Sequence, residues 1–207
     1  MRALILVDIQ NDFLPGGALA VPDGDQVIPI ANQMIDKFDL VFATQDWHPT
    51  DHGSFASQHQ GANVGDMIDL NGLNQIMWPD HCVQETTGAE FAKSLRLNEA
   101  VPVFPKGTDP TIDSYSGFFD NGKRKATGLG DALKEAGVTH VFVLGLATDY
   151  CVKFTALDAK SLGFDVTLIE DGCRGVNLKP TDVADAIKEM ESAGIQIEES
   201  KNVLDIT

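Results

Sequence analysis

The chain has 207 residues, of which 43% are hydrophobic and 22% are charged, the balance of a globular protein with one core. Its net charge of −16 argues against nucleic acid or an anionic membrane as a partner. The longest apolar run, at about 141–147, is too short to cross a bilayer, and the run after Met1 does not resemble a signal peptide. We therefore expect a cytoplasmic protein.

Short β-type runs alternate with helical patterns along the chain. The runs predict strands at 3–7, 40–44, 100–104, 141–146, 166–169 and 195–198, and apolar residues at helical spacing predict helices at 28–38, 129–136, 154–162 and 183–192. This alternation predicts an α/β fold, with a mostly parallel sheet of about six strands and helices on both faces. The strands should be joined by right-handed crossovers. We expect residues 1–207 to form a single domain.

The stretch at about 47–80 breaks this alternation. It is rich in Gly, His, Asn, Asp and Pro, and it holds both tryptophans and three of the five histidines of the chain. Long irregular excursions within compact domains are usually functional or disordered. Its aromatic and imidazole content favours a functional loop.

Polar or reactive side chains follow five of the predicted strands. These are Asp8, Asp46, Lys106, Cys151 and Asp171. In an open α/β sheet, ligands bind outside the carboxyl ends of the strands. Residues that are distant in sequence should therefore converge there, and we expect them to form an active site.

Cys151 is the candidate nucleophile. It follows a buried strand and begins an amphipathic helix, for which Thr148 or Asp149 could provide the N-cap. The helix start, with Lys106 nearby, should lower the pKa of the thiol, and Asp8 could accept its proton and pass it to a leaving amine. The chain has three cysteines, an odd number that disfavours a disulfide framework, and we interpret the other two, Cys82 and Cys173, as inert core residues.

A metal site is expected beside this nucleophile. Asp46 and His48 are two residues apart at a strand end, so both can face one ion, and His81 could add a second imidazole. Two histidines and one aspartate suit Zn²⁺ or Fe²⁺, with positions open for water or substrate. His52 and Ser54 remain possible further ligands, whereas His59 and His140 are interpreted as structural.

Seven segments of the chain also match a known family. The chain resembles the bacterial nicotinamidases, which are isochorismatase-like cysteine hydrolases, and the resemblance covers essentially its whole length. The matching segments are LILVDIQNDF (4–13), QDWHP (45–49), WPDHCVQ (78–84), KG (106–107), YSGFFD (115–120), GLATDYCV (145–152) and DGCRGVN (171–177).

The resemblance implies a fold and a reaction. The fold would be the isochorismatase-like three-layer sandwich. The reaction would convert nicotinamide and water to nicotinate and ammonia through a thioester, serving NAD salvage, and pyrazinamide would be a second substrate. The resemblance further implies a catalytic triad of Asp8, Lys106 and Cys151, with an oxyanion hole formed by the backbone N–H groups of Ala147 and Cys151 and a cis peptide between Leu146 and Ala147.

The resemblance also implies the binding residues. Asp46, His48 and His81 would hold one divalent ion, Zn²⁺ in the first place, with Fe²⁺ or Mn²⁺ as alternatives. Ser54 stands where some relatives carry a histidine, so a further ligand stays open. Phe13 and Trp78 would sandwich the pyridine ring, with Tyr115 near that pocket. We expect a monomer or a homodimer.

Four alternatives are weaker. An isochorismatase would not need Cys151, and an amidase for ureido or carbamoyl compounds would have less reason to keep the metal ligands. An Fe²⁺ oxygenase could use two histidines and one aspartate, but such enzymes usually have all-β folds. A non-catalytic protein stabilised by a metal would leave Asp8, Lys106 and Cys151 unexplained.

Overall fold

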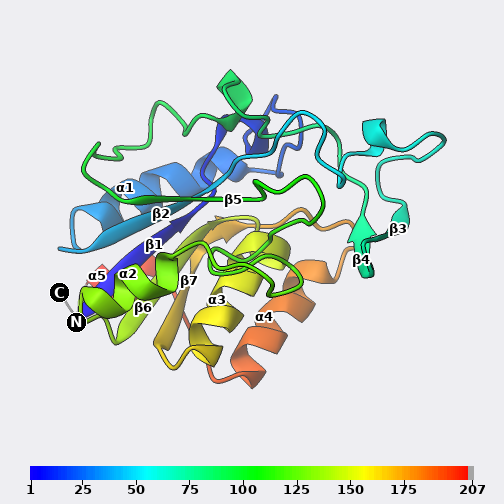
Figure 1. Cartoon of the computed structure of the whole chain (residues 1–207). Coiled ribbons are helices and arrows are strands. Elements are labelled where there is room, and N and C mark those ends of the chain that lie inside the picture. Colours follow the sequence, from blue (N-terminus) through cyan, green and yellow to red (C-terminus); the bar gives the residue numbers. More distant parts are fainter. Residues whose placement is uncertain (205–207) are drawn as a thin grey trace.

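A parallel sheet forms the centre of the protein (Figure 1). The structure is a computed structural model, and it describes residues 1–204. Within them the sheet has six strands in the order β5-β2-β1-β6-β7-β8, and every neighbouring pair is parallel, as expected for an α/β fold. The strands are β1 (Arg2–Val7), β2 (Val41–Asp46), β5 (Val103–Lys106), β6 (His140–Leu146), β7 (Asp165–Arg174) and β8 (Gln196–Glu198).

Helices cover both faces of the sheet, as the alternating pattern predicts. On one face α1 packs against β7 and α5, and on the other α3 packs against β7 and α4 (Figure 1). The helices are α1 (Val27–Ile35), α2 (Leu129–Glu135), α3 (Lys153–Ser161), α4 (Asp182–Ser192) and α5 (Ser200–Leu204). Short 3₁₀ turns occupy Asn11–Phe13, Gly24–Gln26, Ala56–Gln58 and Thr87–Ala89. No helix within residues 1–204 combines the length and the apolar character that a membrane crossing requires.

The core lies along the central strands. Ala3–Val7 of β1 are buried on both faces of the sheet, and so are most residues of β6. A strand covered by helices on both sides reads as a continuous apolar run, because neither face meets water. This explains why both strands could be recognised in the sequence as unbroken apolar runs.

The excursion after β2 contains a hairpin that the sequence analysis did not predict. Strands β3 (Met67–Leu70) and β4 (Leu73–Ile76) pair antiparallel and lie apart from the main sheet (Figure 1). The turn between them is Asn71-Gly72, with φ of 52° and 86°. Two consecutive positive φ angles match the tight turn that Asn-Gly favours in hairpins. The dipeptide was therefore a usable signal for this hairpin.

Strand β7 is longer than predicted, which moves Asp171 away from the expected site. The strand continues past Ile169 to Arg174, so Asp171 lies within it and not after it. Its carboxylate accepts hydrogen bonds from the backbone N–H of Ser200 (2.7 Å) and from its hydroxyl (2.6 Å), at the start of α5. The prediction that Asp171 belongs to the active site is wrong, because its carboxylate anchors the C-terminal helix.

Candidate active site

The other four residues predicted to meet at the strand ends do meet. Asp8 follows β1, Asp46 and Lys106 end β2 and β5, and Cys151 lies in the helical turn after β6. These strands are neighbours in the sheet, so their carboxyl ends share one edge. All four side chains are buried, and Asp8 is completely so. The site is therefore built from a continuous row of strand ends.

The ammonium of Lys106 is the centre of this group. Its Nζ lies 2.9 Å from Asp8 Oδ2, donates to Asp46 Oδ1, and lies 3.3 Å from Cys151 Sγ. It also donates to the carbonyl of Ser114 at 2.9 Å. One buried cation thus contacts two carboxylates and a thiol.

Burial and pairing set the protonation of these groups. Burial raises the pKa of Asp8, and Lys106 only partly opposes that rise. Burial also acts to raise the pKa of Asp46, but Lys106 and His48 outweigh it and hold the pKa of Asp46 far below its usual range. The ammonium of Lys106 in turn keeps a pKa well above its ordinary value, because the carboxylates outweigh its burial.

The thiol of Cys151 departs from the sequence expectation. Burial raises its pKa well above the ordinary value, although Lys106 acts in the opposite direction. The prediction of a lowered pKa is therefore wrong for this closed pocket. The proximity of Lys106 was predicted correctly, but the depth of burial, which has the larger effect, could not be read from the local sequence.

The segment that carries Cys151 begins at a cis peptide. The Leu146–Ala147 bond is cis, as the resemblance implied, and Thr148–Val152 then form one π-helical turn that leads into α3. Neither Thr148 nor Asp149 caps this turn, so that prediction is wrong. The carboxylate of Asp149 instead accepts hydrogen bonds from the backbone N–H groups of Val176 (2.9 Å) and Asn177 (2.8 Å). These bonds join the turn to the segment after β7.

Asp46, His48 and His81 form a compact group of metal-ligand type. Asp46 Oδ2 lies 3.7 Å from His48 Nε2 and 3.8 Å from His81 Nε2. The other ring nitrogens are engaged, since Nδ1 of His48 lies 2.8 Å from the Gly107 carbonyl and Nδ1 of His81 lies 2.7 Å from the Pro79 carbonyl. A carbonyl partner requires the proton on Nδ1, so both Nε2 atoms present a lone pair toward the carboxylate. The residues therefore fit one divalent cation.

The protonation of the two histidines also fits a metal-binding role. Burial lowers the pKa of His81 to about 4, so that ring is neutral near pH 7. Burial also disfavours charge on His48, but Asp46 outweighs it and raises the pKa of that ring. The carboxylate that attracts a proton to this position would equally attract a metal cation.

His52 and Ser54 do not join these three residues. Nδ1 of His52 lies 2.7 Å from the hydroxyl of Ser54, and both side chains are buried. Within residues 1–204 His52 groups with His48 and Asp113 instead. Its ring lies against that of His48, with 4.3 Å between their centroids. His52 therefore packs against a candidate ligand and is separate from the Asp46–His81 pair.

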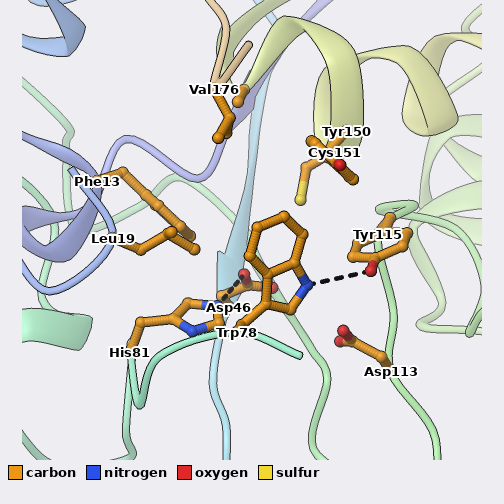
Figure 2. Close-up of a pocket in the computed structure, with 11 residues that line it drawn as sticks. Phe13, Leu19, Asp46, Trp78, His81, Asp113, Tyr115, Tyr150, Cys151 and Val176 are labelled. Carbon is orange, nitrogen blue, oxygen red and sulfur yellow. Dashed lines mark hydrogen bonds and ion pairs between the residues drawn. The ribbon is translucent and has the colours of Figure 1, made fainter. Parts of the chain in front are cut away.

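An aromatic pocket opens next to the thiol, whose sulfur points toward Trp78 (Figure 2). The residues predicted to bind a ring, Phe13, Trp78 and Tyr115, all line it, together with Asp46, His81, Ala147 and Cys151. Trp78 Nε1 donates to the hydroxyl of Tyr115 at 3.1 Å. The sequence analysis did not single out four further lining residues, which are Leu19, Asp113, Tyr150 and Val176. Tyr150 and Val176 lie in matched segments, at 145–152 and 171–177, whereas Leu19 carries no distinguishing signal.

Fold and site together define a class, an α/β enzyme whose reactive groups lie at the carboxyl ends of a parallel sheet. The Isochorismatase domain model matches residues 2–201, and the chain belongs to the isochorismatase family. It is 54% identical over 197 residues to "Nicotinamidase" of Escherichia coli (strain K12), covering 93% of this chain and 92% of that one. The resemblance found in the sequence is thereby confirmed.

Two solved structures extend this comparison. One is "Acinetobacter baumanii nicotinamidase pyrazinamidease", with a TM-score of 0.94, 43% identity, and coverage of 98% of this chain and 97% of that chain. The other is a pyrazinamidase of Pyrococcus horikoshii in complex with zinc, with a TM-score of 0.80, 42% identity, and coverage of 96% and 98% respectively. The expected isochorismatase-like fold is confirmed by these matches.

Proposed function

We propose that the protein hydrolyses nicotinamide to nicotinate and ammonia, in the service of NAD salvage, and that pyrazinamide is a second substrate. The observation that carries the proposal is the contact of one buried ammonium, Lys106, with Asp8, Asp46 and Cys151 beneath an aromatic pocket. The names of the relatives and the 54% identity to one of them support the choice of amide.

The first half of the reaction forms a thioester. Asp8 accepts the proton of the Cys151 thiol, for which its raised pKa makes it a stronger base than an exposed carboxylate. The sulfur bonds to the carboxamide carbon, and the electron pair of the C=O bond moves to the oxygen. Lys106 stabilises the thiolate as it forms, at the 3.3 Å contact. The backbone N–H groups of Ala147 and Cys151 hold the developing oxyanion, and one such donor is typically worth about 3 kcal/mol.

The second half releases both products. Asp8 returns its proton to the nitrogen, the C–N bond breaks, and ammonia leaves. Asp8 then removes a proton from a water molecule, which attacks the thioester carbon. The C–S bond breaks, nicotinate leaves, and Asp8 returns the proton to the sulfur. One carboxylate thus moves every proton, as its place beside both Cys151 and Lys106 permits.

Aromatic side chains and a metal ion together bind the pyridine ring of the substrate. Asp46, His48 and His81 would hold one divalent ion, Zn²⁺ by their chemistry, which supplies a Lewis acid for the pyridine nitrogen, directly or through water. Phe13 and Trp78 contact the faces of the ring, and Tyr115 fixes the indole of Trp78. We also infer a single-domain cytoplasmic enzyme, monomeric or homodimeric, which size-exclusion chromatography with light scattering would test.

Ammonia release provides the direct experiment. The purified protein, reduced and loaded with Zn²⁺, is incubated with nicotinamide, and ammonia and nicotinate are measured together. Equal amounts of both products are expected. A flat trace under these conditions would overturn the proposal.

A further inference from the structure

A buried glutamine outside the pocket contacts the aromatic wall from behind. Gln75 lies on β4 of the hairpin and is only 2% exposed. It does not line the pocket, and no matched motif includes it. Burying an amide is costly unless its polar atoms are bonded, so an apolar side chain would suit a small hairpin better. The amide therefore needs a reason for its position.

The contacts of this amide lead to the pocket. Nε2 of Gln75 lies 3.1 Å from the hydroxyl of Tyr115 and 3.0 Å from Oδ2 of Asp113, and 2.8 Å from the carbonyl of Ile76. The same tyrosine hydroxyl accepts the indole N–H of Trp78 at 3.1 Å, as the dashed line in Figure 2 shows. Gln75, Tyr115 and Trp78 thus form a chain of contacts that ends on the ring wall.

The indole has little other polar support. The backbone of Trp78 is fixed, because its N–H donates to the carbonyl of Ser54 and its carbonyl accepts from the N–H of Ala56, each at 2.8 Å. Within residues 1–204 the indole N–H donates to the hydroxyl of Tyr115 alone. The indole ring also meets Tyr150 edge-on, with 5.0 Å between centroids, but its one hydrogen bond depends on where the Tyr115 hydroxyl lies.

We infer that Gln75 is a positioning residue for substrate recognition, which holds the Tyr115 hydroxyl where it accepts the Trp78 indole and so keeps the aromatic pocket open for a flat heteroaromatic amide. The substrate named here rests on the proposed function, whereas the contacts among Gln75, Tyr115 and Trp78 do not depend on it. Because Gln75 does not line the pocket and contacts Tyr115 and Asp113, it acts on binding of the ring and not on the bond-breaking steps.

Gln75→Met is the central test, since methionine keeps the length of the side chain and removes its donors. We expect the KM for nicotinamide to rise about three- to tenfold, the effect of one lost hydrogen bond, with kcat within about twofold. Gln58→Met is the matched control, because Gln58 is an exposed glutamine of the same excursion and has no contact with Tyr115. An unchanged KM in Gln75→Met would overturn the inference.

A second readout does not require turnover. The chain has two tryptophans, so the free protein gives two indole N–H signals in a ¹⁵N–¹H spectrum, and Trp78→Phe assigns them. In Gln75→Met the Trp78 signal should shift and exchange faster with solvent, while that of Trp47 stays. This result would support the geometry even if nicotinamide were not the substrate. A Trp78 signal that does not move would overturn the inference.

Tyr115→Phe completes a double-mutant cycle, and it keeps the test valid if Gln75→Met fails to fold. Tyr115→Phe should itself shift the Trp78 signal and raise the KM. If Gln75 acts through the hydroxyl, adding Gln75→Met to Tyr115→Phe should change the KM little further. If Gln75→Met raises the KM as much in the Tyr115→Phe variant as in the wild type, Gln75 acts through Asp113, and the inference fails.

Discussion

The ammonium of Lys106 lies 3.3 Å from the sulfur of Cys151. The same ammonium is paired with both carboxylates of the site, so a proton that passes from the sulfur to Asp8 moves between two groups that contact one cation. Nucleophile, base and metal-ligand carboxylate are thereby linked through one cation. The predictions below begin from this link.

Replacement of the nucleophile should abolish turnover. Cys151→Ala is expected to lower kcat about a thousandfold or more, because no other group can form the covalent intermediate. Cys173→Ala is the control, since Cys173 is equally buried but donates to the carbonyl of Ile169 and lies outside the pocket. Steady-state ammonia release and circular dichroism measure activity and folding. Equal losses in the two folded variants would contradict the assignment.

Removal of the ammonium should make the thiol less acidic. Burial already raises the pKa of Cys151, and Lys106 offsets part of that rise, so Lys106→Met should raise the pKa further. The rate of iodoacetamide alkylation, followed by mass spectrometry as a function of pH, reports this value. The alkylation profile should move to higher pH in the variant. A profile identical to that of the wild type would rule out the pairing of Lys106 with the sulfur.

A glycine beside Lys106 should control metal affinity. Gly107 has φ of +63°, and a Cβ there would lie 2.3 Å from Cε1 of His48, whose Nδ1 is bonded to the carbonyl of the same glycine. Gly107→Ala should therefore displace His48 and weaken Zn²⁺ binding about 10- to 100-fold, as lost outer support of a ligand does. Competition with a chromophoric chelator measures the affinity.

The matched control for this change is Gly65→Ala. Gly65 also has a positive φ, +92°, but a Cβ there would meet nothing within 4 Å. The control variant carries a similar backbone strain without the collision, so its Zn²⁺ affinity should stay at the wild-type value. If both variants bound Zn²⁺ as the wild type does, His48 would not be held by Gly107 in the way described.

The substrate's ring nitrogen should matter more than its shape. A pocket that offers a cation to this nitrogen loses a partner when the nitrogen is absent, so benzamide should be far poorer than nicotinamide or pyrazinamide in kcat/KM. Removal of the metal, or His48→Ala, should mainly raise the KM and reduce this discrimination. Benzamide hydrolysed by the metal-loaded enzyme as fast as nicotinamide would remove the proposed role of the metal.

His140 should make stability depend on pH. Burial lowers its pKa below the unfolded value of 6.5, so the unfolded chain binds more protons as the pH falls through that value. The contribution of a neutral His140 is complete above this range and is lost progressively below it. Urea unfolding of wild type and His140→Gln at about pH 7.5 and about pH 5.5 measures the difference. The wild type should lose more stability than the variant on acidification, and equal losses would contradict the prediction.

The sequence was informative wherever function and strand ends coincide. Asp8, Asp46 and Lys106 follow apolar runs that alternate with helical patterns, so their convergence could be predicted from the topology of parallel sheets. The same rule gave a wrong prediction for Asp171. Strand β7 continues beyond Ile169 and pairs again with β6 after an irregularity between Val143 and Gly145. Local pattern does not reveal where a strand resumes its pairing.

Other parts of the site depend on packing that no local pattern records. Leu19 reaches the pocket from a segment outside the matched motifs, and Gln75 contacts Tyr115 from outside the pocket. The shift in the pKa of Cys151 was predicted in the wrong direction, because the helix start and Lys106 are visible in the sequence while the burial of the thiol is not. The direction of a pKa shift therefore cannot be predicted without knowing how deeply the group is buried in the folded protein.

The strand order has a consequence for how the protein is made. Strand β1 lies between β2 and β6, and Arg2 pairs with His140, so β1 is synthesised long before one of its two partners. Pairings of such long sequence separation are slow to form, since loop closure precedes the contacts that reward it. A nascent chain that ends before β6 lacks the central partner of β1 and also Cys151. The reactive thiol therefore emerges from the ribosome only after both carboxylates and the lysine that will surround it.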